Sequence, residues 1–367
     1  MERRWRAAGF RLKSMKILDR YIGLAVVQST LVILAGLLAL SAFFLLIDEL
    51  RRAGQANYSV LQAVEFTLLS VPQHTYELFP IAAVVGSMVA LSILARNGEL
   101  TIVRGAGVSV AGVLVSVMKA GLVLAALVIV LGEFIAPPAA QYARHLRSVA
   151  LTEQISLKGK HGYWTRDGQS FINIKTILPG DRLGGIYIFE FDDANQLRAS
   201  TIAKSAYYSD GQWFLEDLEQ TSIGDDGVSK NKIDRAKWES VLTPDMINMV
   251  ILKPKHLSGW ELFDYIRYLK TNAQESVRYE QALWGKITHP IGIGAMVLIA
   301  VPIVLASLQG FGMAQRVFIA SLIGIAFYIA NQLSAHLGVV YNVNLGISVA
   351  IPTLIIIVVT LVLMRRA

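Results

Sequence analysis

The stretch YIGLAVVQSTLVILAGLLALSAFFLLI, residues 21–47, decides the fold class. It holds 27 residues without a charged side chain. A helix rises about 1.5 Å per residue, so this stretch can cross the roughly 30 Å hydrocarbon core of a bilayer. A secretory signal has a shorter apolar region, of about 7–15 residues. The stretch therefore predicts a retained membrane-spanning helix rather than a cleaved signal.

The rest of the composition agrees with a membrane protein. Of the 367 residues, 54% are hydrophobic, and they are gathered into long runs. The sequence contains no cysteine, which excludes a disulfide framework and a thiolate metal site. Much of the net charge of +7 lies before the first span. The basic residues there are Arg3, Arg4, Arg6, Arg11, Lys13, Lys16 and Arg20. By the positive-inside rule they place the N-terminal tail in the cytoplasm. A nucleic-acid patch is the alternative, which we disfavour because no binding fold surrounds the cluster.

Further apolar runs predict five more spans. Residues 78–95 complete the second span, which begins near Val60, and residues 108–136 form the third. Residues 287–308 form the fourth. Residues 317–364 carry no charge, and the polar turn at 341–346 splits them into two spans. The predicted spans thus number six, with both termini in the cytoplasm.

Between the third and fourth spans the pattern changes. Short β-rich segments appear at residues 162–164, 170–175, 185–191, 197–208, 212–215 and 230–240. Turn signals separate them, at Pro179-Gly180-Asp181, Asp210-Gly211 and Asp225-Asp226-Gly227. This predicts an all-β domain, a β-sandwich or jelly roll. Three spans from a cytoplasmic start place it outside the cytoplasm.

The chain returns to the membrane through a predicted helix. Ser258-Gly259-Trp260-Glu261 has the Ser-x-x-Glu form of a capping box. The aromatic residues that follow are typical of a membrane interface. The predicted layout is a tail at residues 1–20, spans one to three within 21–138, the β domain at 139–257, and the interfacial helix with spans four to six within 258–367.

The short loop LARNGELTIVRGAGVS, residues 94–109, joins the second and third spans in the cytoplasm. Glu99 and Leu100 open a segment that can form one or two helical turns, and Gly105 to Gly107 offer a flexible exit. A charged surface helix attached to two spans would move both when it is pushed. An ordinary solvated loop is the alternative.

Motifs that could drive transport are absent from the sequence. There is no Walker A pattern, no Gly-x-Ser-x-Gly elbow and no His-Glu-x-x-His helix, and the six histidines lack metal-ligand spacing. A proton relay needs acidic or histidine residues within the spans, and the last three spans nearly lack them. An active transporter with this sequence would need a separate ATPase, for which the loop at Glu99 offers a contact.

Basic residues also stand where the positive-inside rule does not expect them. Arg51 and Arg52 end the first span on its outer side, and Arg144 and Arg147 follow the third. Arginine can bind phosphate through two parallel hydrogen bonds, so these residues predict an anionic partner. Snorkelling to lipid headgroups is the alternative.

Lys119, within the third span, is either a functional intramembrane charge or a side chain that snorkels to the cytoplasmic face.

Several motifs, in order along the chain, resemble one family. They are LDRYIG at 18–23, IDELRRAGQ at 47–55, LLSVP at 68–72, the loop at 94–109, VMK at 117–119, GEFIAP at 132–137 and LSGWELFDYIRYLK at 257–270. Each motif alone is weak, but their order around a β domain is specific. From about Lys16 to Arg366 the chain resembles the LptF/LptG family of lipopolysaccharide-export permeases, on the LptG side of that family.

This resemblance implies one permease subunit of an ATP-driven ABC transporter in the bacterial inner membrane, with six spans and a periplasmic jelly roll. The transporter would extract lipopolysaccharide from the inner membrane and pass it to a periplasmic bridge toward the outer membrane. The implied partners are the sister permease LptF, a dimer of the cytoplasmic ATPase LptB, the membrane-anchored LptC and the bridge protein LptA. No cofactor is implied for this chain, because the ATPase would bind ATP and Mg.

The resemblance also implies roles for individual residues. The loop matches the family's coupling helix, and Glu99 matches the acidic residue that docks in the ATPase. The coupling residues predicted in this way are Arg96, Glu99, Leu100 and Arg104. The residues predicted to contact lipopolysaccharide are Arg51, Arg52, Arg144 and Arg147. Leu45 and Gln309 depart from the family, since some relatives carry basic residues at or near these places, so charge recognition could be distributed differently here.

Two other interpretations stay open from the residues alone. One is a mechanotransmitting ABC subunit that moves no lipid through its own spans, which lipid crosslinks at spans one and five would exclude. The other is a membrane scaffold or sensor that uses the β domain as a binding module, which co-purification of an ATPase would exclude.

Overall fold

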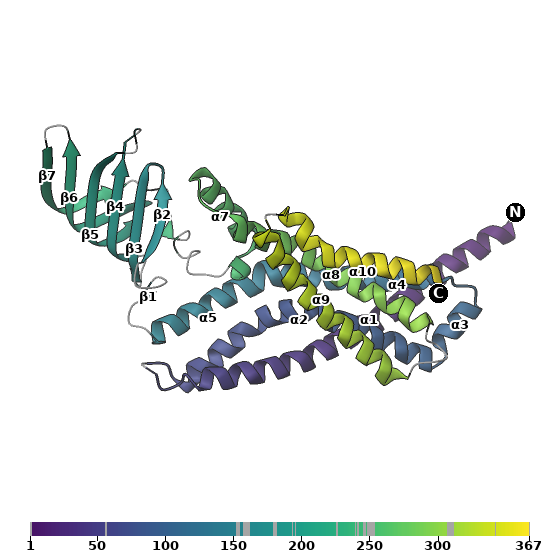
Figure 1. Ribbon diagram of the computed structural model, residues 1–367. Coiled ribbons are helices and arrows are strands. Elements are labelled where there is room, and N and C mark those ends of the chain that lie inside the picture. Colours follow the sequence, from purple (N-terminus) through teal and green to yellow (C-terminus); the bar gives the residue numbers. More distant parts are fainter. Residues whose placement is uncertain are drawn as a thin grey trace. The chain divides into compact units, whose positions relative to one another are not determined.

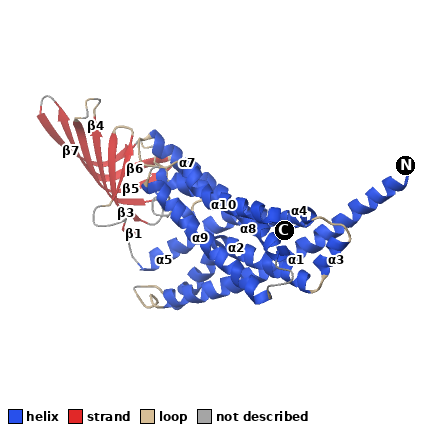
Figure 2. Ribbon diagram, turned by 45° about the vertical axis from the view of Figure 1, so that its right-hand side comes forward, coloured by secondary structure: helices blue, strands red, loops and turns tan. Residues whose placement is uncertain are grey.

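The structure is a computed structural model that covers most of the chain in detail (Figures 1 and 2). The described residues are 2–55, 57–151, 155–156, 162–178, 182–192, 194, 196–224, 227–238, 240, 242–244, 247, 254–306, 312–341 and 343–366. Four of the sequence features above lie outside this description: the basic side chains before residue 17, the turns at Pro179-Gly180-Asp181 and Asp225-Asp226, and Gln309.

The chain divides into two compact units. The helical unit comprises Met1–Arg51, Thr67–Ala140 and Glu280–Ala367. The β unit comprises Arg52–Phe66 and Gln141–Tyr279.

The six predicted spans are confirmed as helices long and apolar enough to cross a membrane. The first three are α1 (Glu2–Leu50), α2 (Val60–Arg96) and α4 (Val110–Val130), which continues through the π-helical turn η1 (Leu131–Ile135) into α5 (Ala136–Leu151). The last three are α8 (Val277–Ala306), α9 (Met313–Val340) and α10 (Leu345–Arg366). The predicted break at residues 341–346 therefore separates α9 from α10.

The core of the helical unit lies where α1, α2, α4 and α8 meet. Val26, Met88, Val117 and Met296, one from each helix, are fully buried in one apolar cluster. The approach of α1 to α2 is close at Gly86, where an added Cβ would lie 2.4 Å from the Cα of Thr30. Small residues at such crossings let membrane helices pack by van der Waals contact, because lipid supplies no hydrophobic force between them.

Two prolines within the spans remove backbone donors that side chains of neighbouring helices replace. Pro80 cannot donate to the carbonyl of Tyr76, four residues earlier on α2. That carbonyl accepts a hydrogen bond from His289 Nε2 of α8 at 2.9 Å. On α10, Pro352 leaves the carbonyl of Ser348 in the same position, and it accepts from the Ser334 hydroxyl of α9. An unsatisfied carbonyl in lipid costs several kcal/mol, so these contacts make the prolines tolerable.

The all-β insertion is confirmed. Its described strands are β1 (Ile155–Ser156), β2 (Tyr163–Asp167), β3 (Ser170–Leu178), β4 (Arg182–Phe191), β5 (Leu197–Ser209), β6 (Gln212–Gly224) and β7 (Gly227–Trp238). They form one antiparallel sheet in the order β1-β3-β4-β5-β6-β7, with β2 also paired to β3. The predicted turn at Asp210-Gly211 joins β5 to β6, with φ angles of 52° and 78° at its two residues. Positive φ at both positions matches the twist of a two-residue hairpin.

One face of the sheet forms the core of the β unit. Ile172 of β3, Ile186 of β4 and Ala203 of β5 all face inward. Inward-facing and outward-facing residues alternate along each strand. Trp213 is buried beneath them, and its indole Nε1 donates to the Leu242 carbonyl at 2.7 Å. This inward face requires an apolar residue at every second position, and that alternation is what predicts the strands from the sequence.

The predicted interfacial helix is α7 (Gly259–Thr271), and its aromatic residues divide between two environments. Trp260 and Phe263 are exposed, whereas Tyr265 and Tyr268 pack into the core of the sheet. Burial raises the pKa of both tyrosine hydroxyls, that of Tyr268 to about 12. The Tyr268 hydroxyl donates to the Arg166 carbonyl at 3.2 Å.

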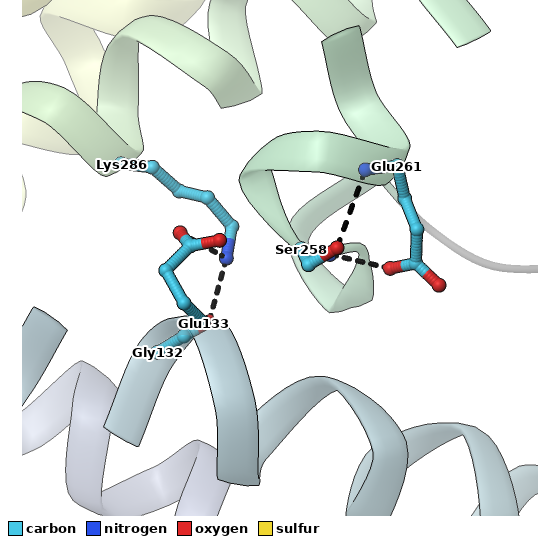
Figure 3. Close-up of polar contacts among 5 residues, drawn as sticks. All are labelled: Gly132, Glu133, Ser258, Glu261 and Lys286. Atoms are coloured by element: carbon cyan, nitrogen blue, oxygen red, sulfur yellow. Dashed lines mark hydrogen bonds and ion pairs between the residues drawn. The ribbon is translucent and has the colours of Figure 1, made fainter. Parts of the chain in front are cut away.

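The predicted capping box fixes the start of α7 (Figure 3). The Ser258 hydroxyl accepts from the Glu261 backbone N–H at 3.2 Å, and the Glu261 carboxylate accepts from the Ser258 N–H at 2.6 Å. Two of the N–H groups that a helix start leaves unpaired are satisfied in this way.

Replacement of Ser258 by alanine should loosen the first turn of α7. Loss of an N-cap hydroxyl costs about 1 kcal/mol, which is roughly a fivefold change in the opening equilibrium. Hydrogen exchange at the amides of α7 in the full chain measures this change. The control is Thr271→Ala, whose hydroxyl bonds only to the Arg267 carbonyl at the other end of the helix. Unchanged exchange in Ser258→Ala would show that the cap does not hold α7.

Candidate functional site

The loop predicted to contact a partner contains a short helix, α3 (Glu99–Gly105). Gly98, with φ of 75°, precedes it, and Gly107, with φ of 88°, follows it. Both angles lie in the left-handed region, which glycine adopts without strain. The predicted flexible exit is thus a defined turn in the structure. Ser109 then caps α4, since its hydroxyl accepts from the Gly112 N–H at 3.2 Å.

The side chains of α3 divide into an anchored side and an exposed side. Leu100 is 2% exposed and packs into the core of the helical unit. Ile102, two residues later, is 71% exposed, and the predicted coupling residues Arg96 and Arg104 are also exposed. The structure therefore makes Leu100 the anchor of α3 rather than a surface contact. Ile102 lies about 200° around the helix from Leu100, on the exposed side of α3. It is a further candidate for the partner contact, and the sequence analysis did not name it as one.

Glu99 is partly exposed at the first turn of α3, where its charge suits the positive end of the helix. Its carboxylate accepts from the Asn97 side-chain amide at 3.2 Å and interacts with the Tyr21 hydroxyl of α1. The acidic residue predicted to meet a partner is thus held next to the first span.

Lys119 pairs with an acidic residue on the first span. Its Nζ contacts Asp19 of α1, which also accepts from the Ser116 hydroxyl. The Lys119 side chain is 56% exposed and that of Asp19 15%. Neither interpretation of Lys119 from the sequence, as a functional charge or as a snorkelling side chain, includes this ion pair with Asp19. The ion pair links α1 to α4, as the Tyr21 contact links α1 to α3.

The basic residues predicted to contact an anion fall into two kinds. Arg51 and Arg52 follow the last turn of α1, and both side chains are exposed. Arg144 and Arg147 lie on α5 and are half-buried. Arg144 is hydrogen-bonded to His256, and the Arg147 guanidinium lies 5.0 Å from the centre of the Phe66 ring. Among the four, Arg51 and Arg52 are therefore the more accessible to a ligand.

The loop after α1 is tied to α5 within the β unit. The Asn57 backbone N–H donates to the Ala150 carbonyl of α5 at 3.1 Å. Tyr58, 1% exposed, packs against Ala150. Arg52, at the start of this loop, is thereby brought into the same unit as Arg144 and Arg147.

Within the described part of the chain, no group of three or more His, Asp or Glu side chains could hold a metal ion.

Comparison with known proteins gives a consistent result along the chain. The family model described as lipopolysaccharide export system permease LptF/LptG matches residues 20–366. The chain is 33% identical over 351 residues to the lipopolysaccharide export system permease protein LptG of Haemophilus influenzae, covering 95% of this chain and 98% of the relative. It is 31% identical over 353 residues to LptG of Escherichia coli K12, with the same coverage. The chain belongs to the LptF/LptG family of lipopolysaccharide export system permeases, membrane subunits of an ABC transporter.

Proposed function

We propose that this chain is the LptG-type permease that couples ATP hydrolysis to the extraction of lipopolysaccharide from the bacterial inner membrane. In this proposal it assembles with the sister permease LptF and a dimer of the ATPase LptB. It delivers lipid to LptC and LptA in the periplasm. ATP and Mg bind to the ATPase, and this chain carries no cofactor and no catalytic residue of its own. The observation that carries the proposal is the anchored, charged helix α3 in a chain of this family.

Extraction requires an external energy source. Moving an acyl chain out of the bilayer costs about 0.8 kcal/mol for each CH₂ group exposed to water. Lipid A carries several acyl chains, so the total far exceeds thermal energy. A permease that lacks a nucleotide-binding motif must receive this energy from its partner, which makes the contact surface for the ATPase the central functional element.

The contacts of α3 suit it to pass motion into the spans. Leu100 is buried in the core of the helical unit, so a push on α3 moves that core. Glu99 meets Tyr21 of α1. The helix α1 is joined in turn to α4 by Asp19 and Lys119. Glu99, Arg96, Arg104 and Ile102 supply the charged and apolar surface that an ATPase groove would bind.

The accessible arginines suit the phosphates of lipopolysaccharide. Guanidinium groups bind phosphate through two charge-assisted hydrogen bonds. Arg51 and Arg52 stand at the outer end of α1, where the headgroup of a lipid in the outer leaflet would lie. Arg144 and Arg147 would contribute less to phosphate binding, since their guanidinium groups are already engaged by His256 and Phe66.

The second face of the sheet offers a surface for acyl chains. Trp164, Tyr187 and Ile202 face the same side in neighbouring strands, and Trp164 stacks on Phe189 at 5.8 Å between ring centres. Phe171 pairs with Phe189 on this side. Trp164, Phe171 and Ile202 are 53%, 40% and 44% exposed. We call this set the aromatic face, and we propose that it receives the acyl chains during delivery.

Glu99→Ala should reduce ATP-dependent lipopolysaccharide release at least tenfold in proteoliposomes that contain the complete complex. The carboxylate would be missing from the ATPase contact, so binding of the ATPase should also weaken. Thr101→Ala, an exposed neighbour on α3, is the control and should behave as the unmodified chain. Full assembly and full release by Glu99→Ala would refute the coupling role.

Charge reversal at the outer end of α1 should weaken lipid recognition without disturbing the ATPase contact. The double variant Arg51→Glu with Arg52→Glu should lose most of the stimulation of ATP hydrolysis by lipopolysaccharide, because the phosphates would meet like charge. The control reverses two exposed lysines of the sheet, Lys204→Glu with Lys232→Glu. Stimulation equal to that of the control would contradict a phosphate contact at Arg51 and Arg52.

Photocrosslinking tests the aromatic face. A photoreactive amino acid at Phe171 or Ile202 should capture lipopolysaccharide in an ATP-dependent manner. The same probe at Asp210, at the exposed tip of the β5–β6 hairpin, should not. If only the β domain of the sister permease is captured by equivalent probes, the domain in this chain has a structural role.

A further inference from the structure

Helices α2 and α8 and the turn η1 meet at a polar cluster within the helical unit. The cluster consists of Tyr76, Gly132, Glu133, Lys286 and His289. Figure 3 shows Lys286 extending from α8 toward Gly132 and Glu133. Its Nζ donates to the Gly132 carbonyl at 2.7 Å and contacts Glu133 Oε1 at 3.2 Å. Charged side chains inside membrane proteins are costly and usually have a function.

The geometry of η1 explains why the Gly132 carbonyl needs a donor from another helix. The Ala136 N–H, which would bond to Gly132 in an α-helix, bonds instead to the Leu131 carbonyl, five residues back. In this π register the next donor would be the N–H of residue 137. Residue 137 is proline and has none. Lys286 supplies the missing hydrogen bond.

The cluster is built to hold Lys286 in this place. The Glu133 carboxylate balances its charge, and the two side chains are only 21% and 11% exposed. Gly132 is in tight contact with Tyr76, because an added Cβ would lie 2.4 Å from the Tyr76 ring. The ring of Tyr76 stacks on His289 with centres 4.2 Å apart. Lys286 and His289, three residues apart, share one face of α8.

The register of η1 determines which way the residues after it face. Each residue of an α-helix turns the chain by about 100°. A π-helical turn accommodates roughly one extra residue. If η1 returned to α-helical register, α5 would rotate about its axis relative to α4 by roughly that angle. Arg144 and Arg147 lie on α5 and would rotate with it.

We propose that Lys286 is a positioning residue. By capping the Gly132 carbonyl it holds the third span in π register and so sets the face of α5 that carries Arg144 and Arg147. The consequence of this register for transport rests on the proposed function, because Arg144 and Arg147 are assigned to lipopolysaccharide only in that proposal. The register itself can be tested without lipid.

Spin labels on α4 and α5 measure the register directly. The chain has no cysteine, so Leu122→Cys with Tyr142→Cys gives one labelled pair at exposed positions. In the full complex in nanodiscs, Lys286→Met should shift the distance between these labels by roughly 2 Å or more, as expected for a change of one residue in register. Lys286→Arg, which keeps a charged donor, and Glu133→Gln, which keeps the Lys286–Gly132 bond, should retain the unmodified distance.

A rescue variant distinguishes loss of the cap from general damage. Pro137→Ala restores an N–H that donates to the Glu133 carbonyl once the turn is in α register, where the Ala136 N–H already satisfies Gly132. The double variant Lys286→Met with Pro137→Ala therefore leaves neither carbonyl without a donor in α register. It should assemble even if Lys286→Met alone does not, and it should show the shifted label distance. Lipopolysaccharide release by this variant should be about tenfold lower than that of the unmodified complex.

Three results would overturn the proposal. They are an unmodified label distance in Lys286→Met, an equal shift in Glu133→Gln, and an unmodified label distance in the double variant Lys286→Met with Pro137→Ala. If the unmodified complex moves no lipopolysaccharide but the label distances behave as expected, the proposed function fails while the role of Lys286 in the register stands.

Discussion

In a lipid environment every backbone carbonyl needs a hydrogen-bond donor, and this requirement shapes the helical unit. The prolines at positions 80, 137 and 352 each remove a donor from a span. The carbonyls left open are satisfied by His289, Lys286 and Ser334, each from a neighbouring helix. These contacts bind α2 and the third span to α8, and α10 to α9. Because each one is directional, it fixes the rotation of a helix as well as its position.

The cytoplasmic side of the helical unit is joined by a different set of contacts. Tyr21 meets Glu99, and Asp19 meets Lys119, so α1 is linked to both α3 and α4. Leu100 ties α3 to the core beneath it. A force on α3 would thus reach α1, α4 and the core beneath Leu100. The carbonyl contacts at Gly132 would then transmit or resist that motion at the point where the third span becomes α5.

Much of the fold could be predicted from the sequence because its signals are local. The spans follow from uncharged runs, the strands from alternation and turn residues, and the start of α7 from Ser258 and Glu261 three positions apart. The contacts that refine the candidate site are not local. Lys286 and Gly132 are 154 residues apart, and Arg144 and His256 are 112 apart. Leu100 resembled a surface residue in sequence, because nothing local distinguishes an anchoring leucine from an exposed Ile102.

We conclude that this chain works as one permease of an ATP-driven lipopolysaccharide exporter. Purification of the tagged chain from native membranes, followed by mass spectrometry of the bound proteins and lipids, tests it most directly. We expect a cytoplasmic ATPase, a second permease of the same family and lipopolysaccharide in one complex. Recovery of the assembled chain with no ATPase would contradict it.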